Sequence, residues 1–192
     1  MAQRTKSVVT PERFAQGLTY EQWLEAIDRN EERFRENYER TELSEEDVGA
    51  FRELVARPDG PARCLALAEA WCPDAFRGLP VVARIAEAAG MELRIFFRDQ
   101  NKDIMAEFLN QGEFESIPTF VFYTRDHRYI AQWAERPAIA NEQMGELRKI
   151  FEGRPREEAM ADYISFQNGP IWANWRQETV REIRELLAQH CR

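Results

Sequence analysis

The chain has 192 residues, and its 34 acidic and 26 basic side chains give a formal net charge of −8. Apolar residues make up 44% and charged residues 31%, which is typical of a globular protein and excludes collagen-like and wholly disordered chains. Because an acidic surface without a local cluster of Lys and Arg repels phosphate backbones, we expect no nucleic-acid partner.

No apolar stretch approaches the length of a membrane-spanning helix, and residues 1–17 lack the apolar region of a signal peptide. We therefore expect a cytoplasmic protein without a membrane partner. The three cysteines, Cys64, Cys72 and Cys191, are too few and too scattered for a disulfide framework, so each is expected to be a free thiol. With two histidines and no motif of metal-ligand spacing, we expect no metal site and no cofactor.

The first 60 residues have the pattern of a helical extension. Residues 19–40 are predicted to form one long helix, because Thr19 and Gln22 have the spacing of a capping box and an apolar stripe follows. A second helix is expected after Ser44, a favourable N-cap, and the Pro and Gly residues of 58–61 end it. We interpret the aromatic side chains of both helices as packing rather than as a ligand site.

From residue 61 the pattern becomes that of an α/β unit. Residues 64–68 form a run of small apolar side chains, which predicts a strand buried on both faces, and residues 93–97 predict a second strand. Residues 76–89 between them have helical periodicity and are followed by Gly90, a common helix end. Two strands joined through a helix are expected to lie parallel in one sheet.

The remaining segments add a hairpin and further helices. A short helix is expected over residues 103–109, and residues 119–123 and 129–133 predict two strands around a polar turn. The chain is then helical from residue 137, and its last amphipathic helix is expected over residues 172–189.

Short motifs lie at defined places on these predicted elements. Trp71-Cys72-Pro73-Asp74 stands at the junction between the first strand and its helix, and Pro80 follows within that helix. Ile117-Pro118-Thr119 immediately precedes the hairpin. Together with the order of the elements, these motifs resemble the thioredoxin-like superfamily over about residues 62–152. With the helical segment in front, the chain is similar to bacterial members described only as thioredoxin family proteins.

The resemblance implies an α/β, thioredoxin-like fold, in which a central mixed sheet of about four strands is flanked by helices within residues 61–152. Helical extensions would lie at 1–60 and 153–192. The resemblance also implies a cis bond before Pro118, which leaves the backbone of Ile117 free to pair with an extended substrate. The groove would be flanked by the residues beside the cysteine, Trp71, Pro73 and Asp74, although a core position is an equal alternative for the tryptophan.

Cys72 is the residue expected to carry chemistry. A thiol at the first turn of a helix lies near unpaired N–H groups and the positive end of the helix dipole, and both favour the thiolate. Pro73 suits that turn because it has no N–H to leave unsatisfied. The charge of Asp74 opposes the effect, so we expect the pKa of Cys72 to fall only modestly below the free-thiol value of about 8.5. The alternative is a buried, unreactive cysteine.

The chain departs from the family's redox motif. The second cysteine of that motif would stand at position 75, where this chain has Ala75, so a mixed disulfide has no internal thiol to release it. The family's buried acid is replaced by Ala66, and strand alternation is expected to direct the nearby Glu69 elsewhere. Ala134 stands where many relatives have glycine. Cys64 lies eight residues upstream of Cys72 in the same strand, roughly 26 Å away, and is expected to be a core residue.

These observations leave three functions open. The first is a thiol–disulfide oxidoreductase of monothiol type, in which Cys72 is the nucleophile, an external thiol is the resolver, and the partners are protein or low-molecular-weight thiols and disulfides. The second is a non-catalytic binding or adaptor protein that keeps the groove. The third is an oxidant sensor in which Cys72 reaches the sulfenic acid. Ala75 argues against a general dithiol reductase.

Overall fold

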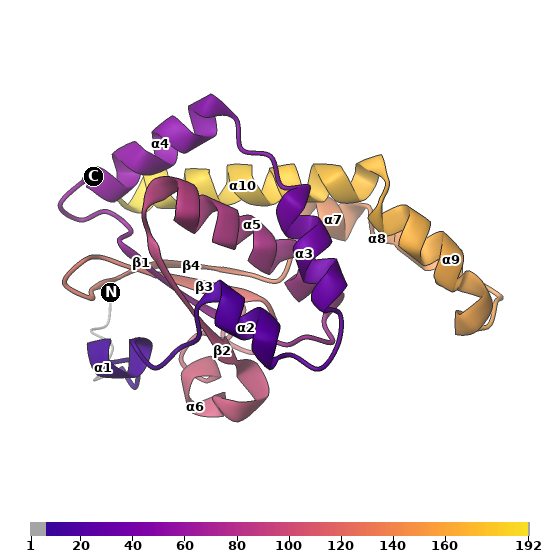
Figure 1. The fold of residues 1–192 in the computed structure, drawn as a ribbon, viewed down its shortest axis with the longest axis horizontal. Helices are drawn as coiled ribbons and strands as arrows, with labels where there is room; N and C mark the ends of the chain where they lie inside the picture. The colour runs from indigo at the N-terminus through magenta and orange to yellow at the C-terminus, as the bar shows by residue number, and fades with distance from the viewer. Residues whose placement is uncertain (1–6, 192) are drawn as a thin grey trace.

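A four-stranded sheet forms the centre of the computed structural model, which describes residues 7–191 (Figure 1). Its strands are β1 (Arg63–Ala68), β2 (Glu92–Phe97), β3 (Thr119–Tyr123) and β4 (Tyr129–Ala134). They lie in the order β2-β1-β3-β4, with β1 and β2 parallel and the other two pairs antiparallel. The predicted mixed sheet, with its parallel unit and its hairpin, is therefore confirmed.

β1 lies inside the sheet and separates two hydrophobic clusters. Because side chains alternate along a strand, Leu65 and Leu67 belong to one cluster, whereas Cys64, Ala66 and Ala68 belong to the other. All five residues have an exposure of 0%. Burial on both faces accounts for the unbroken apolar run in the sequence.

Helices cover both faces of the sheet. The larger cluster lies under α5 (Pro73–Ala89), and α5 contacts α3 (Glu31–Glu39), α4 (Glu45–Ala56) and α10 (Pro170–His190). Figure 1 shows α10 running across the molecule beside α5 and α4. The smaller cluster on the other face is closed by α1 (Pro11–Phe14) and by α6 (Lys102–Met105), which is shorter than its sequence pattern predicts.

The N-terminal segment differs from the sequence prediction in one respect. The single helix predicted over residues 19–40 is wrong, because a turn divides it into α2 (Tyr20–Ala26) and α3. Asn30 in this turn has a left-handed backbone with a φ of 60°, and its side-chain amide donates a hydrogen bond to the C=O of Ala70 at 2.8 Å. A contact with a residue 40 positions away thus breaks the helix, and helical periodicity carries no sign of it.

Local signals in the same segment are confirmed. Thr19 and Gln22 form the predicted capping box, and the Ser44 side chain caps α4. Leu18 forms an antiparallel bridge with Ile95 of β2, with N–H to oxygen distances of 2.9 and 2.8 Å. The segment before α2 is therefore tied to the edge of the sheet.

Of the helices after β4, two project from the molecule and the last one packs against its body. α7 (Ala138–Glu142) leads to α8 (Met144–Phe151) and α9 (Arg156–Gln167), which extend from the body of the molecule (Figure 1). α10, in contrast, buries a row of apolar side chains against α4 and α5: Trp172, Trp175, Val180, Ile183 and Leu187. Over residues 7–191, no helix combines the length and the apolar character needed to span a membrane.

Candidate functional site

Cys72 lies where the end of β1 leads into α5. It is the N-cap residue of α5, its backbone is extended, and Pro73 occupies the first position of the helix. The C=O of Cys72 accepts hydrogen bonds from the N–H groups of Ala75 and Phe76 at 3.0 and 3.1 Å. The predicted position of this cysteine at a strand-to-helix junction is therefore confirmed.

The thiol of Cys72 lies against the backbone of residue 117. The Ile117–Pro118 bond is cis, as expected, and the sulfur of Cys72 donates a hydrogen bond to the C=O of Ile117 at 3.5 Å. α5 approaches this segment closely, since a Cβ at Gly78 would lie 3.2 Å from Cγ of Pro118. Within residues 7–191, no group accepts a hydrogen bond from the N–H of Ile117. A thiol and an unpaired backbone donor therefore lie next to each other.

The ionisation of Cys72 differs from the sequence prediction. The residue is 8% exposed, and burial raises the pKa of its thiol to about 11, so the expected lowering is wrong. The charge of Asp74 adds to the increase, whereas backbone hydrogen bonds from Ala75 and Asp74 and the charge of Arg77 oppose it. The stabilisation expected at a helix start is present, but it is smaller than the cost of desolvating the thiolate. The thiolate is therefore a small minority of Cys72 at pH 7.

Two arginines hold Asp74. Its carboxylate lies 2.6 Å from Nη1 of Arg77 and 2.8 Å from Nη2 of Arg136. The side chain of Arg77 is fully buried, and its guanidinium carbon lies 5.2 and 5.4 Å from the ring centroids of Trp172 and Trp175. Ion pairing and cation–π stacking together fix this guanidinium. α10 therefore helps to position the acid beside the thiol.

The turn after β4 supports the segment around residue 117. The N–H of Glu135 donates to the C=O of Pro118 at 2.7 Å, and its carboxylate accepts a hydrogen bond from the Ser116 hydroxyl at 3.1 Å. Glu135 has a left-handed backbone with a φ of 71°, which favours glycine. The family pattern suggested Ala134 for such a residue, but Ala134 is still part of β4. In this chain the left-handed position is one residue later.

Trp71 lies on the surface beside the thiol. It is 49% exposed, which excludes the alternative of a core aromatic. Its ring centroid is 5.7 Å from the guanidinium carbon of Arg98, the first residue of the short helix η1 (Arg98–Gln100). A cavity of about 380 Å³ next to it is bordered by η1 and by the turn between α2 and α3. The exposed ring thus has space beside it for a ligand.

No acid takes the place of the family's buried carboxylate within residues 7–191. Ala66 is fully buried and has no polar side chain. The carboxylate of Glu69 accepts a hydrogen bond from the backbone N–H of Asp99 at 2.8 Å, and burial raises its pKa. Glu69 is therefore directed toward η1, as strand alternation predicts.

Among the described residues, no second thiol is placed to resolve a disulfide on Cys72. Ala75 is fully buried at the position of the second cysteine of the family motif. Cys64 is fully buried within β1, as expected, and burial raises its pKa far above its usual range. The C=O of Cys191 accepts a hydrogen bond from Arg57 at 2.7 Å, just beyond α4. Cys191 lies at the C-terminal end of α10, about 24 Å along the helix from Trp175 and farther from Trp172.

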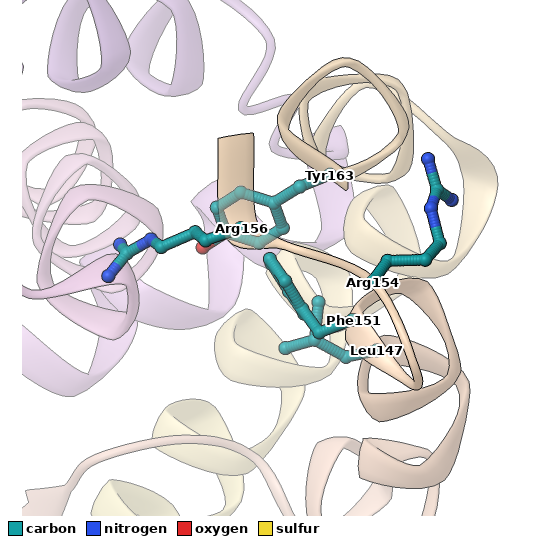
Figure 2. Close-up of a pocket in the computed structure, with 5 residues that line it drawn as sticks. All are labelled: Leu147, Phe151, Arg154, Arg156 and Tyr163. Atoms are coloured by element: carbon teal, nitrogen blue, oxygen red, sulfur yellow. The ribbon is translucent and has the colours of Figure 1, made fainter. Parts of the chain in front are cut away.

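A separate hollow lies between α8 and α9. Figure 2 shows Leu147 and Phe151 gathered near the ring of Tyr163, and the centroids of the two rings are 5.4 Å apart. Arg154 at its edge pairs with Asp162 at 2.6 Å. No cysteine is among the described residues that line this hollow, so it is not part of the thiol site.

Sequence reasoning missed the arginines of the site and the tryptophans that contact them. Arg77 stands three residues after Asp74, the spacing of an ion pair on a helix, and this signal was available in the sequence. Trp172 follows Arg77 by 95 residues, and no local pattern connects the two. The cation–π contact is a property of the tertiary fold.

A cysteine at the start of α5, opposite a cis proline at the end of a mixed sheet, is the arrangement of the thioredoxin-like class. Residues 17–149 match the model of a family described as thioredoxin, and the chain belongs to that family. The expected thioredoxin-like α/β fold with helical extensions is therefore confirmed.

Two solved structures share the fold over nearly the whole chain. A protein of unknown function from Pseudomonas aeruginosa has a TM-score of 0.65 and 18% identity, and the match covers 96% of this chain and 99% of that one. An HIV epitope scaffold has a TM-score of 0.64 and 15% identity with the same coverage. No curated protein matches the chain. At these identities the likeness supports the fold, including the helices outside the matched family segment.

Proposed function

We propose that the protein is a thiol–disulfide oxidoreductase of monothiol type, with Cys72 as the nucleophile and an external thiol as the resolver. The observation that supports this most directly is the position of the Cys72 sulfur, 3.5 Å from the C=O of Ile117. An extended peptide that pairs with the backbone of Ile117 brings its own disulfide next to this sulfur. The substrates are therefore extended protein segments and low-molecular-weight disulfides.

The reaction uses two different thiols in two steps. The Cys72 thiolate attacks one sulfur of the substrate disulfide, forms a mixed disulfide and releases the other sulfur as a thiolate, which takes up a proton. An external thiolate then attacks the substrate sulfur of the mixed disulfide and releases Cys72. Ala75 takes no part in this release, because its methyl group is not a nucleophile.

The raised pKa of Cys72 affects both steps. Few Cys72 thiols are ionised at neutral pH, so the first attack is slow. A sulfur with a high pKa is also a poor leaving group, so release of the mixed disulfide is slow as well. Together with the missing resolving thiol, these effects favour a long-lived adduct over rapid turnover.

The proposal also includes a cytoplasmic location and a bacterial origin. Release of Cys72 requires a reduced external thiol, and the cytoplasm supplies such thiols in abundance. The Trp71-Cys72-Pro73-Asp74 motif supports a bacterial member of the thioredoxin family. The need for an external thiol predicts that the adduct is released in a reducing compartment.

Trapping the mixed disulfide tests the proposal. The full chain would be incubated with an extended peptide that carries an activated disulfide, and mass spectrometry would assign the modified cysteine. We expect an adduct at Cys72 that glutathione releases, no adduct in Cys72→Ser, and an unchanged adduct in the matched control Cys191→Ser. Modification confined to Cys64 or Cys191, or none at Cys72 even at pH 9, would contradict the proposal.

A second candidate function is favoured by the burial of Cys72. Because a thiol with a pKa of about 11 is poorly reactive, the same groove would serve in a non-catalytic binding or adaptor protein. Such a protein binds a reduced extended peptide equally well as wild type and as Cys72→Ser, and forms no covalent adduct. The raised pKa also argues against the oxidant sensor, since sulfenic acid forms from the thiolate.

A further inference from the structure

A cavity of about 650 Å³ lies between the end of α3 and the first turns of α10. Two arginines line it, Arg176 from α10 and Arg40 from the end of α3. Arg176 is 6% exposed, whereas Arg40 is exposed. The cavity therefore has one buried and one accessible guanidinium group.

Arg176 is a buried cation without a carboxylate partner among residues 7–191. Its Nη1 donates to Oδ1 of Asn37 at 3.1 Å, and its Nε has no hydrogen-bond partner in the same range. Burial lowers the pKa of Arg176, and the charges of Arg40 and Arg77 lower it further, against a small opposite effect of Glu42. Because an uncompensated buried charge is costly, guanidinium groups in such positions are normally paired.

Arg40 also pairs with an amide instead of an acid. Its Nη1 donates to the side-chain oxygen of Asn168, and within the described residues it forms no ion pair. Glu39 and Glu42 line the cavity as well, but neither carboxylate pairs with Arg40 or Arg176 in that part of the chain. Two guanidinium groups at one cavity thus keep donors that no carboxylate of the described chain occupies.

We propose that this cavity binds a small molecule through an oxyanion group, a carboxylate or a phosphate, held by Arg176 and Arg40. Guanidinium groups bind either oxyanion through two parallel hydrogen bonds, and an anion would compensate the buried charge. The volume is in the range of small-molecule sites. Glu39 and Glu42, which also line the cavity, favour a ligand that carries a hydroxyl or ammonium donor as well.

Thermal unfolding of the full chain tests this site independently of thiol chemistry. Phosphate and citrate would be titrated at constant ionic strength, with sodium chloride as the balancing salt. We expect at least one of them to raise the Tm in a concentration-dependent manner that chloride does not reproduce. If only phosphate raises the Tm, the ligand carries a phosphate group. If only citrate raises it, the ligand carries a carboxylate. The absence of any anion-specific shift at tens of millimolar would overturn the proposal.

Arg40→Gln is the decisive variant, because Arg40 is exposed and its replacement leaves the buried core unchanged. We expect it to weaken anion binding about tenfold, as for the loss of one charge-assisted hydrogen bond, while the variant still unfolds cooperatively in chloride. Arg35→Gln is the matched control, since Arg35 lies on the same helix, pairs with Glu31 at 2.8 Å and does not line the cavity. Arg176→Gln should abolish the anion response. An equal response in wild type, Arg40→Gln and Arg35→Gln would overturn the site.

Discussion

Cys64 lies near the start of β1 and Cys72 four residues beyond its end, and both thiols are buried. Cys64 lies within a regular strand in the larger hydrophobic cluster, and its sulfur donates to the C=O of Leu65 at 3.8 Å. Cys72 meets the start of a helix, the C=O of Ile117 and a charged pair of side chains. The two thiols thus share burial and differ in the polar groups around them.

Comparing the two cysteines distinguishes the effect of burial on a thiol pKa from the effect of a position at a helix start. Burial raises the pKa of both thiols, and it raises that of Cys64 further. Cys64 has one backbone hydrogen bond that favours its thiolate, whereas Cys72 has two and the charge of Arg77. A helix start therefore moderates the effect of burial on a cysteine without reversing it.

The largest expected effect is the pH dependence of alkylation at Cys72. Because iodoacetamide reacts with the thiolate, its rate should rise about tenfold per pH unit, and about a thousandfold from pH 7 to pH 10. Cys64 is the internal control and should stay unmodified, since it is inaccessible in the folded protein. Mass spectrometry measures each cysteine separately. If the alkylation rate of Cys72 reached a plateau below pH 9, the pKa of Cys72 would not be raised, and burial would not outweigh the helix start.

A pH-dependent loss of stability should follow from the same thiol. The folded protein holds the proton of Cys72 more tightly than the unfolded chain, so the stabilisation is complete below about pH 8.5 and is lost as the pH rises toward about 11. We expect the urea stability of wild type to fall by about 2 kcal/mol more than that of Cys72→Ala between pH 8 and pH 10. Parallel curves for the two proteins would contradict the raised pKa.

Ala75→Cys should restore a dithiol site at the start of α5. Position 75 lies within the first helical turn after Cys72, and its N–H donates to the C=O of Cys72 at 3.0 Å. We expect insulin reduction with dithiothreitol, weak or absent in wild type, to rise about tenfold or more. Ala83→Cys adds a buried thiol elsewhere on α5 and should give no increase. Equal rates of insulin reduction for the two variants would favour the non-catalytic binding or adaptor protein.

Asp74→Asn should lower the pKa of Cys72, with a smaller effect on its reactivity than the changes above. Removal of the carboxylate removes a charge that raises the pKa of Cys72 and leaves Arg77 to favour the thiolate. We expect the pKa to fall and alkylation at pH 7 to become about three to ten times faster. Asp126→Asn removes one charge in the turn between β3 and β4 and should have no effect. An equal change in both variants would indicate a general charge effect.

The smallest expected effect concerns the backbone beside the thiol site. At the left-handed φ of Glu135, Glu135→Gly should be about 1 kcal/mol more stable than Glu135→Ala, because both lose the same side-chain contacts. Ala134→Gly should destabilise, since Ala134 lies in a regular strand. Urea unfolding measures both differences. If Ala134→Gly were stabilising and Glu135→Gly were less stable than Glu135→Ala, position 134 would be the one that favours glycine.

The sequence predicts the elements whose causes are local. The strands of residues 64–68 and 119–123, the capping box of Thr19 and the N-cap of Ser44 all depend on neighbouring residues, and all are confirmed. The division between α2 and α3 was missed, because it depends on the hydrogen bond of Asn30 to a residue after β1. Prediction from periodicity therefore fails where a distant contact overrides a local pattern.

The site shows the same limit. The position of Cys72 at a helix start and the cis bond before Pro118 follow from short motifs that resemble a known family. The direction of the Cys72 pKa shift was predicted wrongly, since the burial of its sulfur depends on segments that are distant in sequence. Arg176 does leave a local signal, because it stands four residues from both Trp172 and Val180 and so lies on the apolar stripe of α10, but its neighbour Arg40 across the cavity comes from a distant helix.

The stacking of Arg77 on Trp172 and Trp175 also has a consequence for the order of assembly during synthesis. Residues 73–89 leave the ribosome well before residues 170–190, and folding begins before the chain is complete. Until α10 docks, Arg77 has no aromatic partner from that helix, and the arrangement that holds Asp74 is incomplete. The thiol site is therefore finished late in synthesis, although its cysteine is made early.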